Sequence, residues 1–412
     1  MQQMAPRCVG PQVTIPAMKV IRLREGKDRS LQRGHPWVFA GSVEKGKADA
    51  GETVRIDTHD GRFLAWGAFS PESQIRVRAW SRDEAERIDA AFFQRRIAAA
   101  VAMRQRLNIA SNGMRLVHGE ADGLPGLVVD RYDDILSVQF LSAGSERWKP
   151  VIADALVAAT GCTRLYERSD VGVRQLEGLA PAKGWLRGDG STVVTLREHD
   201  LQLTVDVEEG HKTGYYLDQR ENRALFARLV RQFGCKTVLN CYSYTGGFSV
   251  AALMGGATDV TSVDSSGPAL ERASAHVALN GFDADGIHHT LDADVNGTLR
   301  RFLEEGRTFD AIVLDPPKFA PSAAHADRAS RAYKDINRLG LKLLNPGGLL
   351  LTFSCSGGIS ADLFHKIVAG AGNDAGVDGY LLQRLEAAPD HPTTLCFPEG
   401  EYLKGLVILR QA

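Results

Sequence analysis

The chain has 412 residues, 44% of them hydrophobic and 24% charged, and a formal net charge of -1 at pH 7. Such a composition is typical of a globular protein with enough apolar residues for about two to four domain cores. The low net charge argues against an extended basic surface that binds nucleic acid. No apolar run reaches the roughly 18 residues that span a bilayer. Residues 1–17 lack the apolar core of a signal peptide, so we expect a flexible N-terminal tail and a cytoplasmic protein without membrane contact.

Short β-rich runs, from "KVIRL" to "QIRVRAW", occupy residues 19–82 and predict a small β-barrel. Turn segments such as "HDGR" separate these runs. Apolar residues at helical spacing predict a helix over residues 83–107. We therefore expect an N-terminal domain at residues 18–97.

Basic residues gather at the start of this domain. A chain with so little net charge needs a local basic patch of this kind to bind nucleic acid. An ordinary solvated charged face explains these basic residues equally well. The candidate RNA-binding residues of the patch are Arg22, Arg24 and Arg33.

A compact α+β middle domain is predicted over residues 98–191. The runs "GLVVDRY" and "ILSVQFL" flank a turn and predict a hairpin, "RWKPVIADALVAAT" predicts a helix, and "TRLYERSD" predicts another strand. The segment "LEGLAPAKGWLRGDGS" is rich in turn formers, so we expect a loop there that ends the domain.

From about Thr192 the pattern changes to an alternation of strands and helices, which predicts a doubly wound, mostly parallel sheet at residues 192–412. Its predicted strands include "KTVLNCYS", "DVTSVDSS", "GIHHTLDADV", "FDAIVLDPP" and "GGLLLTFSCS". The tail "TLCFPEGEYLKGLVILR" predicts two antiparallel edge strands around "PEGEY". In such sheets ligands bind beyond the carboxyl ends of the strands.

The turn after the first predicted strand, "VLNCYSYTGGFSV", has the features of a cofactor loop. Gly246 and Gly247 permit a tight turn and close approach of a ligand. Asp264 ends the next strand, where a carboxylate can hold ribose hydroxyls, and Asp292 or Asp294 lies where it can reach an adenine. Because GxGxxG is absent, S-adenosylmethionine (SAM) is favoured over NAD, although these acids are also good helix N-caps.

Several long motifs carry a resemblance to a known family. "HPWVFAG", "FSPESQIRVRAW", "GEADGLPGLVVDR", "GHKTGYYLDQRENR", "LNCYSYTGGF", "DPPKFA", "YKDIN" and "LLTFSCSG" together resemble the ribosomal RNA large subunit methyltransferase I family over nearly the whole chain after Met18. The resemblance implies an α/β protein with an RNA-binding PUA β-barrel, an α+β middle domain and a Rossmann-like class I methyltransferase domain. It also implies transfer of a methyl group from SAM to carbon 5 of a cytosine in 23S rRNA. Because the target base must leave any stack to expose carbon 6, we expect free or partly assembled rRNA as the substrate.

Two strand ends are implied to carry the reaction: Asp315 in "DPP" as the base-binding carboxylate and Cys355 in "SCS" as the nucleophile. A thiolate that adds to carbon 6 of the ring activates carbon 5, and the carboxylate helps to absorb charge at nitrogen 3. None of the six cysteines forms a CxxC pair and no histidine cluster accompanies them, so neither a metal site nor a disulfide is predicted. For Cys355 the alternative is a small buried residue, as expected for the other five.

The tyrosines of "KTGYYLDQR" either cover the cofactor or belong to the core, and one of Tyr215 and Tyr216 is expected to be structural. Lys318 contacts a phosphate or the base, or is a solvated lysine. The cofactor-binding residues expected from the resemblance are Tyr216, Arg220, Asn240, Tyr242, Tyr244, Thr245, Gly246, Asp264, Ser265, Asp292, Ala293 and Asp315, and those expected at the base are Lys318 and Phe319.

Other functions remain open at this point. "DPP" also occurs in enzymes that methylate exocyclic amines, which need no thiol, so an RNA amine methyltransferase is one alternative. A non-catalytic RNA-binding assembly factor and a nicotinamide oxidoreductase are two others.

Overall fold

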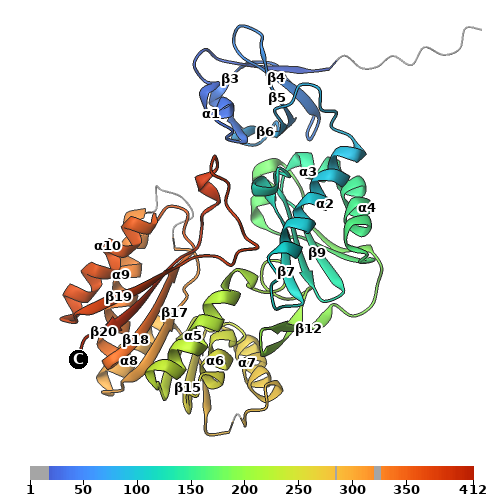
Figure 1. The fold of residues 1–412 in the computed structure, drawn as a ribbon. Coiled ribbons are helices and arrows are strands. Elements are labelled where there is room, and N and C mark those ends of the chain that lie inside the picture. The colour runs from blue at the N-terminus through green and yellow to red at the C-terminus, as the bar shows by residue number, and fades with distance from the viewer. Residues whose placement is uncertain (1–17, 284, 320–325) are drawn as a thin grey trace, which may run out of the picture.

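The computed structural model describes residues 18–283, 285–319 and 326–412. Three units follow one another along the chain, with the N-terminal unit at the top of Figure 1, the middle unit at the right and the C-terminal unit at the bottom left. In this described part of the chain, no helix has the length and hydropathy to cross a membrane.

The N-terminal unit is the predicted small β domain. Its six-stranded sheet has the order β2-β6-β5-β4-β1-β3, with a short helix α1 (Arg29–Gln32) beside it. Ile21, Val54 and Val77 are fully buried in its core. The strands are β1 (Val20–Leu23), β2 (Trp37–Phe39), β3 (Val43–Lys45), β4 (Thr53–Asp57), β5 (Phe63–Phe69) and β6 (Ile75–Ser81).

The long helix α2 (Ala90–Arg106) belongs with the middle unit. It begins later than the sequence predicts because Asp89 caps it, accepting a hydrogen bond from the Phe92 backbone N–H at 3.0 Å. Phe92, Phe93 and Ile97 are fully buried in the core of the middle unit. The predicted domain boundary after residue 97 therefore falls inside a helix that packs on the second domain.

The middle unit is a five-stranded sheet of order β11-β10-β9-β8-β7, covered by α2 and α4 (Lys149–Thr160). One prediction for this unit was wrong: the turn-rich segment after residue 175 contains strand β11, which pairs antiparallel with β10. Trp185 packs edge-on against Tyr166 at 5.0 Å between ring centroids, and this contact outweighs the flanking turn formers. The strands are β7 (Gly113–His118), β8 (Leu127–Tyr132), β9 (Ile135–Phe140), β10 (Arg164–Ser169) and β11 (Ala182–Arg187).

An antiparallel hairpin precedes the alternating region, and the sequence pattern did not predict this hairpin. It consists of β12 (Val193–Glu198) and β13 (Leu201–Asp206), and it buries every second residue, as in Leu201, Leu203 and Val205. Helix α5 (Arg220–Phe233) follows and leads into the large sheet.

The predicted doubly wound sheet is confirmed. Its seven strands have the order β16-β15-β14-β17-β18-β20-β19, and the first five are parallel. Figure 1 shows helices on both faces. The strands are β14 (Thr237–Cys241), β15 (Asp259–Asp264), β16 (His288–Asp292), β17 (Phe309–Leu314), β18 (Leu344–Ser354), β19 (Gly379–Leu385) and β20 (Lys404–Arg410). The helices between them are α6 (Gly247–Met254), α7 (Gly267–Leu279), α8 (Val295–Glu304), α9 (Ala326–Leu343) and α10 (Ala361–Ala375).

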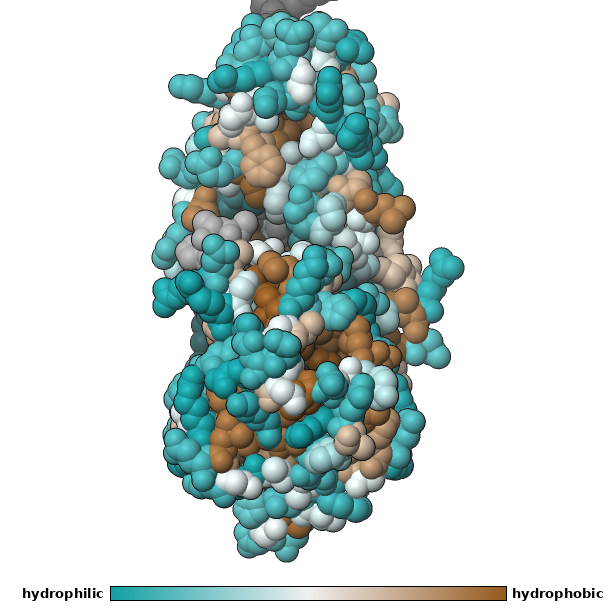
Figure 2. Space-filling model, turned by 90° about the vertical axis from the view of Figure 1, so that its left-hand side faces the viewer, coloured by the Kyte–Doolittle hydropathy of each residue, from teal (hydrophilic) through white to brown (hydrophobic). Residues whose placement is uncertain are grey.

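Strand β19 leaves apolar side chains at the outer edge of this sheet. Tyr380, Leu381 and Leu382 are all exposed, because β19 is the last strand in the order. On the face seen in Figure 2, hydrophilic side chains predominate and hydrophobic ones gather at and below mid-height.

The predicted C-terminal hairpin was partly wrong. Strand β20 exists, but it pairs with β18 and β19, and the "TLCF" segment forms no strand. Residues 386–403, here called the C-terminal loop, leave the sheet and rise toward the N-terminal domain in Figure 1. Tertiary contacts stabilise this course, because the loop reaches side chains of all three units.

Asp390 anchors the loop. Its carboxylate is fully buried and accepts hydrogen bonds from the Arg220 guanidinium at 2.8 Å and from the Arg115 backbone N–H at 2.9 Å. The Arg104 guanidinium, also fully buried, donates to the Asp390 carbonyl at 3.2 Å. The pKa of Asp390 lies well below its ordinary value, since the contacts with His391 and Arg220 outweigh the effect of burial.

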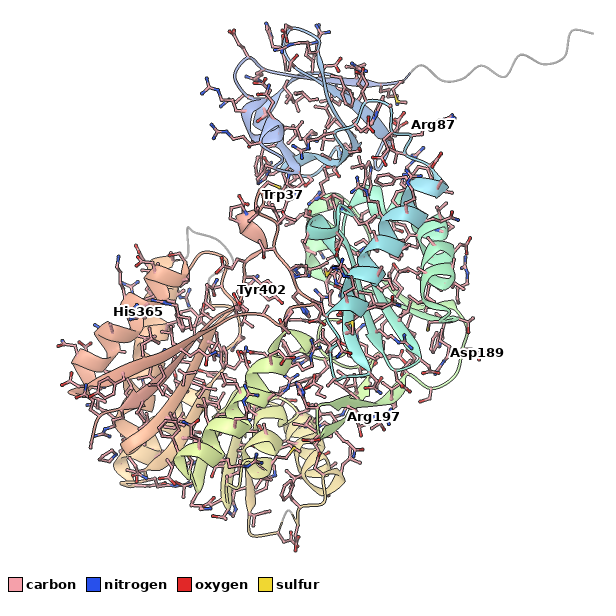
Figure 3. The ribbon with its side chains drawn as sticks, in the orientation of Figure 1. Trp37, Arg87, Asp189, Arg197, His365 and Tyr402 are labelled. Atoms are coloured by element: carbon pink, nitrogen blue, oxygen red, sulfur yellow. The ribbon has the colours of Figure 1, made fainter. Side chains whose placement is uncertain are left out.

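The tip of the loop contacts the N-terminal domain. Phe397 packs edge-on against Trp37 with ring centroids 4.7 Å apart, and Glu399 lies 3.3 Å from the His35 ring nitrogen. Trp37 also donates to Glu120 of the middle unit at 2.8 Å. Figure 3 shows Trp37 at the lower edge of the N-terminal domain and Tyr402 at the base of the loop. The loop thus connects the first and last domains.

We expect the Asp390→Ala substitution to lower the free energy of unfolding by about 3–5 kcal/mol, because it removes the buried carboxylate that pairs with Arg220 and leaves the partly exposed Glu221 as the remaining ion-pair partner. Urea denaturation followed by tryptophan fluorescence measures this change. The control is Asp362→Ala, which breaks an exposed pair with Lys366 and should have no measurable effect. Equal midpoints for the two variants would contradict the assignment.

Candidate active site

The turn between β14 and α6 has an unusual backbone. Tyr242 and Tyr244 have φ values of +56° and +48°, a left-handed conformation that costs energy for non-glycine residues. Gly246 has φ +74°, and a Cβ there would lie 2.7 Å from the Ala273 Cβ, so the position requires glycine. Strained backbone of this kind is concentrated at ligand sites.

Asp264 holds this turn in place. One carboxylate oxygen accepts from the Tyr244 backbone N–H at 2.8 Å, and the other accepts from the Ser266 backbone N–H at 3.0 Å. Each oxygen keeps a further lone pair for a ligand. The alternative role as an N-cap falls to Ser266, whose side chain accepts from the Ala269 backbone N–H at the start of α7.

The acidic residues at the end of β16 also have different roles. Asp294 caps α8 by accepting from the Gly297 backbone N–H at 2.7 Å, whereas Asp292 is exposed and sits opposite Asp264 in the strand register. Ser265 is exposed, and the Ala293 backbone N–H donates to the Asp264 carbonyl at 3.0 Å. Asp264 and Asp292 therefore form one acidic edge beside the turn.

Two buried hydroxyl groups of the turn have no hydrogen-bond partner within the described residues: Ser243 Oγ and Thr245 Oγ1. Buried polar groups are normally paired, so these atoms fit a site for a polar ligand. Asn240 is occupied, since it donates to Ser249 Oγ at 2.8 Å beneath the turn. The turn, its orphan hydroxyls and the acidic edge suit a ligand with ribose hydroxyls.

Aromatic side chains cover one side of the turn. Tyr244 stacks on His211 with ring centroids 4.3 Å apart, and Tyr216 lies edge-on to Tyr244 at 5.5 Å. Tyr215 is buried in the core, with the Arg223 guanidinium 4.8 Å from its ring centroid. The structural tyrosine of the pair is thus Tyr215, and Tyr216 remains partly exposed at the site.

Asp315 and Cys355 follow adjacent strands. Because β17 and β18 are parallel, with Leu314 opposite Thr352, their carboxyl ends lie at the same edge of the sheet. Burial, then the charge of Asp218, raises the pKa of Asp315 to about 6, while a 3.0 Å hydrogen bond from Gln219 Nε2 opposes the rise. The site therefore holds a carboxyl group that titrates near neutrality.

Cys355 is partly exposed and is influenced electrostatically by Asp315. Burial, then the charge of Asp315, raises the pKa of the thiol, and the charges of Lys212 and Lys318 oppose the rise. The Cys241 thiol is fully buried, which raises its pKa well above the ordinary value and fits the packing role expected for it. The charge of the Asp315 carboxylate therefore influences the protonation of the Cys355 thiol.

Comparison with known proteins decides the family. Residues 172–405 match an S-adenosylmethionine-dependent methyltransferase model and residues 21–82 a PUA-like domain model. Proteins named ribosomal RNA large subunit methyltransferase I are similar over most of the chain: 48% identity with that of Shewanella denitrificans and 49% with that of Shewanella amazonensis, each covering 94% of this chain and 98% of the relative. That of Alteromonas mediterranea is 49% identical, over 93% of this chain and 97% of the relative.

This chain belongs to the ribosomal RNA large subunit methyltransferase I family. Its cofactor is SAM, and its α/β fold consists of a PUA-like domain followed by a methyltransferase domain. A SAM-dependent methyltransferase from Streptococcus mutans has the same fold, with a TM-score of 0.81 at 22% identity over 95% of this chain and all of that one. Another solved structure, of a methyltransferase complexed with SAH, has a TM-score of 0.83 at 22% identity.

Within the family site, Arg220 has a different role from the one expected. Its guanidinium is fully buried and is occupied by Asp390 and by the Gly113 carbonyl at 3.2 Å. An arginine enclosed in this way has no donors to offer a cofactor, so we assign Arg220 to joining the methyltransferase domain to the C-terminal loop.

The residues expected at the base lie in different surroundings. Lys318 is exposed next to the site, but Phe319 packs on Tyr333, 4.8 Å between ring centroids, and is therefore engaged with the core. Arg22, Arg24 and Arg33 lie in the PUA-like domain, where Arg24 and Arg33 are exposed and Arg22 is partly buried. They are not brought together with the active site.

Sequence reasoning missed the charged residues around Cys355. Lys212 Nζ lies 4.3 Å from the Tyr216 ring centroid and donates to Asp218 at 3.3 Å, and Tyr402 donates to the same Asp218 oxygen at 2.6 Å. Both residues lie in "KTGYYLDQR", where the sequence indicates Asp218 only as a possible helix cap and gives Lys212 no role. Within the described residues, no group of three or more His, Cys, Asp or Glu side chains is placed to hold a metal ion.

We expect the Asp264→Ala substitution to weaken binding of S-adenosylhomocysteine by more than about tenfold, because it removes charged hydrogen-bond acceptors from the cofactor turn. Calorimetry measures the dissociation constant. The matched control is Asp294→Ala, which removes only a helix cap and should change affinity by less than about twofold while lowering stability by about 1 kcal/mol. Similar losses in both variants would contradict the role of Asp264.

A second expectation concerns stability and pH. Because the folded protein raises the pKa of Asp315 to about 6, its ionised form destabilises the fold, increasingly as pH rises from about 4 to 6. Asp315→Asn should therefore raise Tm at pH 7.5 and have little effect at pH 4.5, as measured by differential scanning calorimetry. Asp310→Asn, at the start of the same strand, should lower Tm at pH 7.5, because hydrogen bonds depress the pKa of Asp310. A change in Tm of the same sign for both variants at pH 7.5 would refute this account.

Proposed function

We propose that this protein transfers a methyl group from SAM to carbon 5 of a cytosine in the 23S rRNA of the large ribosomal subunit, through a covalent bond between Cys355 and carbon 6. The observation that carries the proposal is the placement of a thiol and a carboxyl group at adjacent strand ends beside the SAM turn. The names of the relatives support the RNA substrate.

The chemistry explains why both groups are needed. The Cys355 thiol gives up its proton, and the sulfur forms a bond to carbon 6 while the double bond between carbons 5 and 6 opens. SAM, when bound, supplies a methyl carbon activated by a positive sulfur. Carbon 5 takes that methyl carbon and S-adenosylhomocysteine leaves. A base then removes the proton from carbon 5, the double bond re-forms and the Cys355 thiolate departs.

Asp315 has the properties of a group that steadies the ring during this addition. Electron density moves toward nitrogen 3 when the sulfur adds, and a carboxyl group there hydrogen-bonds or protonates that atom. A pKa of about 6 lets Asp315 exchange a proton near physiological pH. Gln219 holds the carboxylate from the opposite side at 3.0 Å.

The target base has to leave any stack so that carbon 6 reaches the thiol. We therefore infer that the substrate is free or partly assembled rRNA, which places the protein in the cytoplasm. The PUA-like domain, with Arg24 and Arg33 exposed, is the expected RNA-binding unit. Its position is held by the contact of Trp37 with Phe397 of the C-terminal loop and by a buried ion pair between its Arg78 and Glu177 of the middle unit at 2.6 Å.

Methylation of an exocyclic amine fits this site less well. That reaction uses an aromatic residue after "DPP" to stack on the flipped base, but Lys318 stands there and Phe319 packs on Tyr333. It also gives no role to a thiol that shares the electrostatic environment of Asp315.

Cytosine that carries fluorine at carbon 5 tests the mechanism, because fluorine cannot leave as a proton and the adduct persists. Wild-type protein with SAM and 5-fluorocytosine rRNA should give a slowly migrating RNA–protein band on a denaturing gel. Cys355→Ala should give none, and Cys396→Ala, a partly exposed thiol in the C-terminal loop, should give the wild-type band. Absence of the band in wild type, or its persistence in Cys355→Ala, would exclude the covalent mechanism.

A further inference from the structure

A buried lysine lies next to the turn that carries Cys355. Lys404 is the first residue of β20 and sits directly opposite Ser354, the last residue of β18, in the antiparallel register. Its side chain is almost completely enclosed, with 6% of the residue exposed. Because Cys355 follows Ser354, this register places Lys404 beside the turn that carries the thiol.

The Lys404 ammonium group holds the turn by its backbone. Lys404 Nζ donates to the Ser356 carbonyl at 3.0 Å. From the other side, the Tyr333 hydroxyl lies 3.0 Å from Ser356 Oγ, and the Ser356 backbone N–H donates to Ser354 Oγ at 3.3 Å. The peptide after Cys355 is thus held between β20 and α9.

The charge of Lys404 has no carboxylate partner within 4.0 Å among the described residues. A buried ammonium group without a counter-ion is costly, so a compensating anion is expected nearby. Burial lowers the pKa of Lys404, and the charge of Cys355, then that of Glu401, raises it. Glu401 is exposed, so Cys355 is the enclosed one of these two groups and becomes a compensating anion when it loses its proton.

The other charged groups that face Cys355 are committed elsewhere or are solvated. Asp315 and Asp218 disfavour a thiolate, while Lys212 and Lys318 favour it. Lys212 is already paired with Asp218 at 3.3 Å, and Lys318 is exposed to water, which screens its charge. Lys404 is the enclosed cation of this set.

We propose that Lys404 is a positioning residue for Cys355: it orients the turn that carries the thiol and supplies the buried positive charge that balances the Cys355 thiolate. The proposal rests on the nucleophilic role proposed above for Cys355. During the reaction the thiol proton leaves, the anion is held beside the ammonium group, and the same contact is available when elimination regenerates the thiolate. Lys404 itself keeps its protons and forms no bond to the substrate.

Thiol alkylation measures the thiolate directly and does not require RNA. The rate at which iodoacetamide modifies Cys355, followed by mass spectrometry of the peptide, should be recorded from pH 6 to 10 for wild type, Lys404→Arg and Lys404→Met. Lys404→Met should move the midpoint upward by about one pH unit, which is about tenfold slower alkylation at pH 7.5. Lys404→Arg should stay close to wild type, because it keeps the charge.

Two further variants separate charge from structure. Lys404→Gln keeps an N–H donor for the Ser356 carbonyl but no charge, so it should shift the midpoint as Lys404→Met does. Lys366→Met removes a lysine from an exposed pair with Asp362 and should leave the profile unchanged. Wild-type affinity for S-adenosylhomocysteine shows that each variant is folded.

An unchanged midpoint in both folded Lys404→Met and folded Lys404→Gln would overturn the proposal. If Lys404→Met fails to fold, the folded Lys404→Gln protein alone decides it. The fluorocytosine trap keeps this result distinct from the proposed function: a trapped adduct with no midpoint shift refutes only the role of Lys404. A midpoint shift without any adduct refutes the covalent mechanism and leaves the electrostatic pairing in place.

Discussion

The chemistry of this protein depends on the parallel pairing of β17 with β18. Parallel strands end at the same edge of a sheet, so the residues that follow them, Asp315 and Cys355, meet beside the turn after β14. A carboxylate and a thiolate are both anions and repel each other. The two groups are therefore kept at the site against an electrostatic cost, which the positive charges of Lys212 and Lys318 reduce for Cys355.

Other features of the site also lower the stability of the fold. The backbone at Tyr242 and Tyr244 is left-handed, the hydroxyls of Ser243 and Thr245 are buried without partners in the described structure, and the pKa of Asp315 is raised. Each of these features lowers stability and prepares the site for SAM or for the base. Strain and buried charge concentrated at one sheet edge are what a preorganised site requires, because groups held in advance need not rearrange during the reaction.

The rest of the fold keeps this edge in a fixed relation to the PUA-like domain. The C-terminal loop connects β19 with β20, is anchored by Asp390 to Arg220, and packs its tip against Trp37 of the PUA-like domain. Its base carries Tyr402, which donates to Asp218 next to Lys212. One segment therefore contributes to the active-site charges and to the placement of the PUA-like domain.

The sequence by itself determined the elements whose signals are local. The alternation of apolar strands and helices, the turn around Gly246 and the acids at strand ends are all encoded within short windows, so the sheet, the turn after β14 and the strand ends at Asp315 and Cys355 could be predicted. The family motifs added the roles proposed for these two residues. Only the tertiary structure decided which side chains meet across the chain: Arg220 with Asp390, Phe319 with Tyr333, β20 with β19, and Lys404 with the Cys355 turn. Such partners are set by long-range packing, and a local pattern carries no information about a residue that lies far away in the sequence.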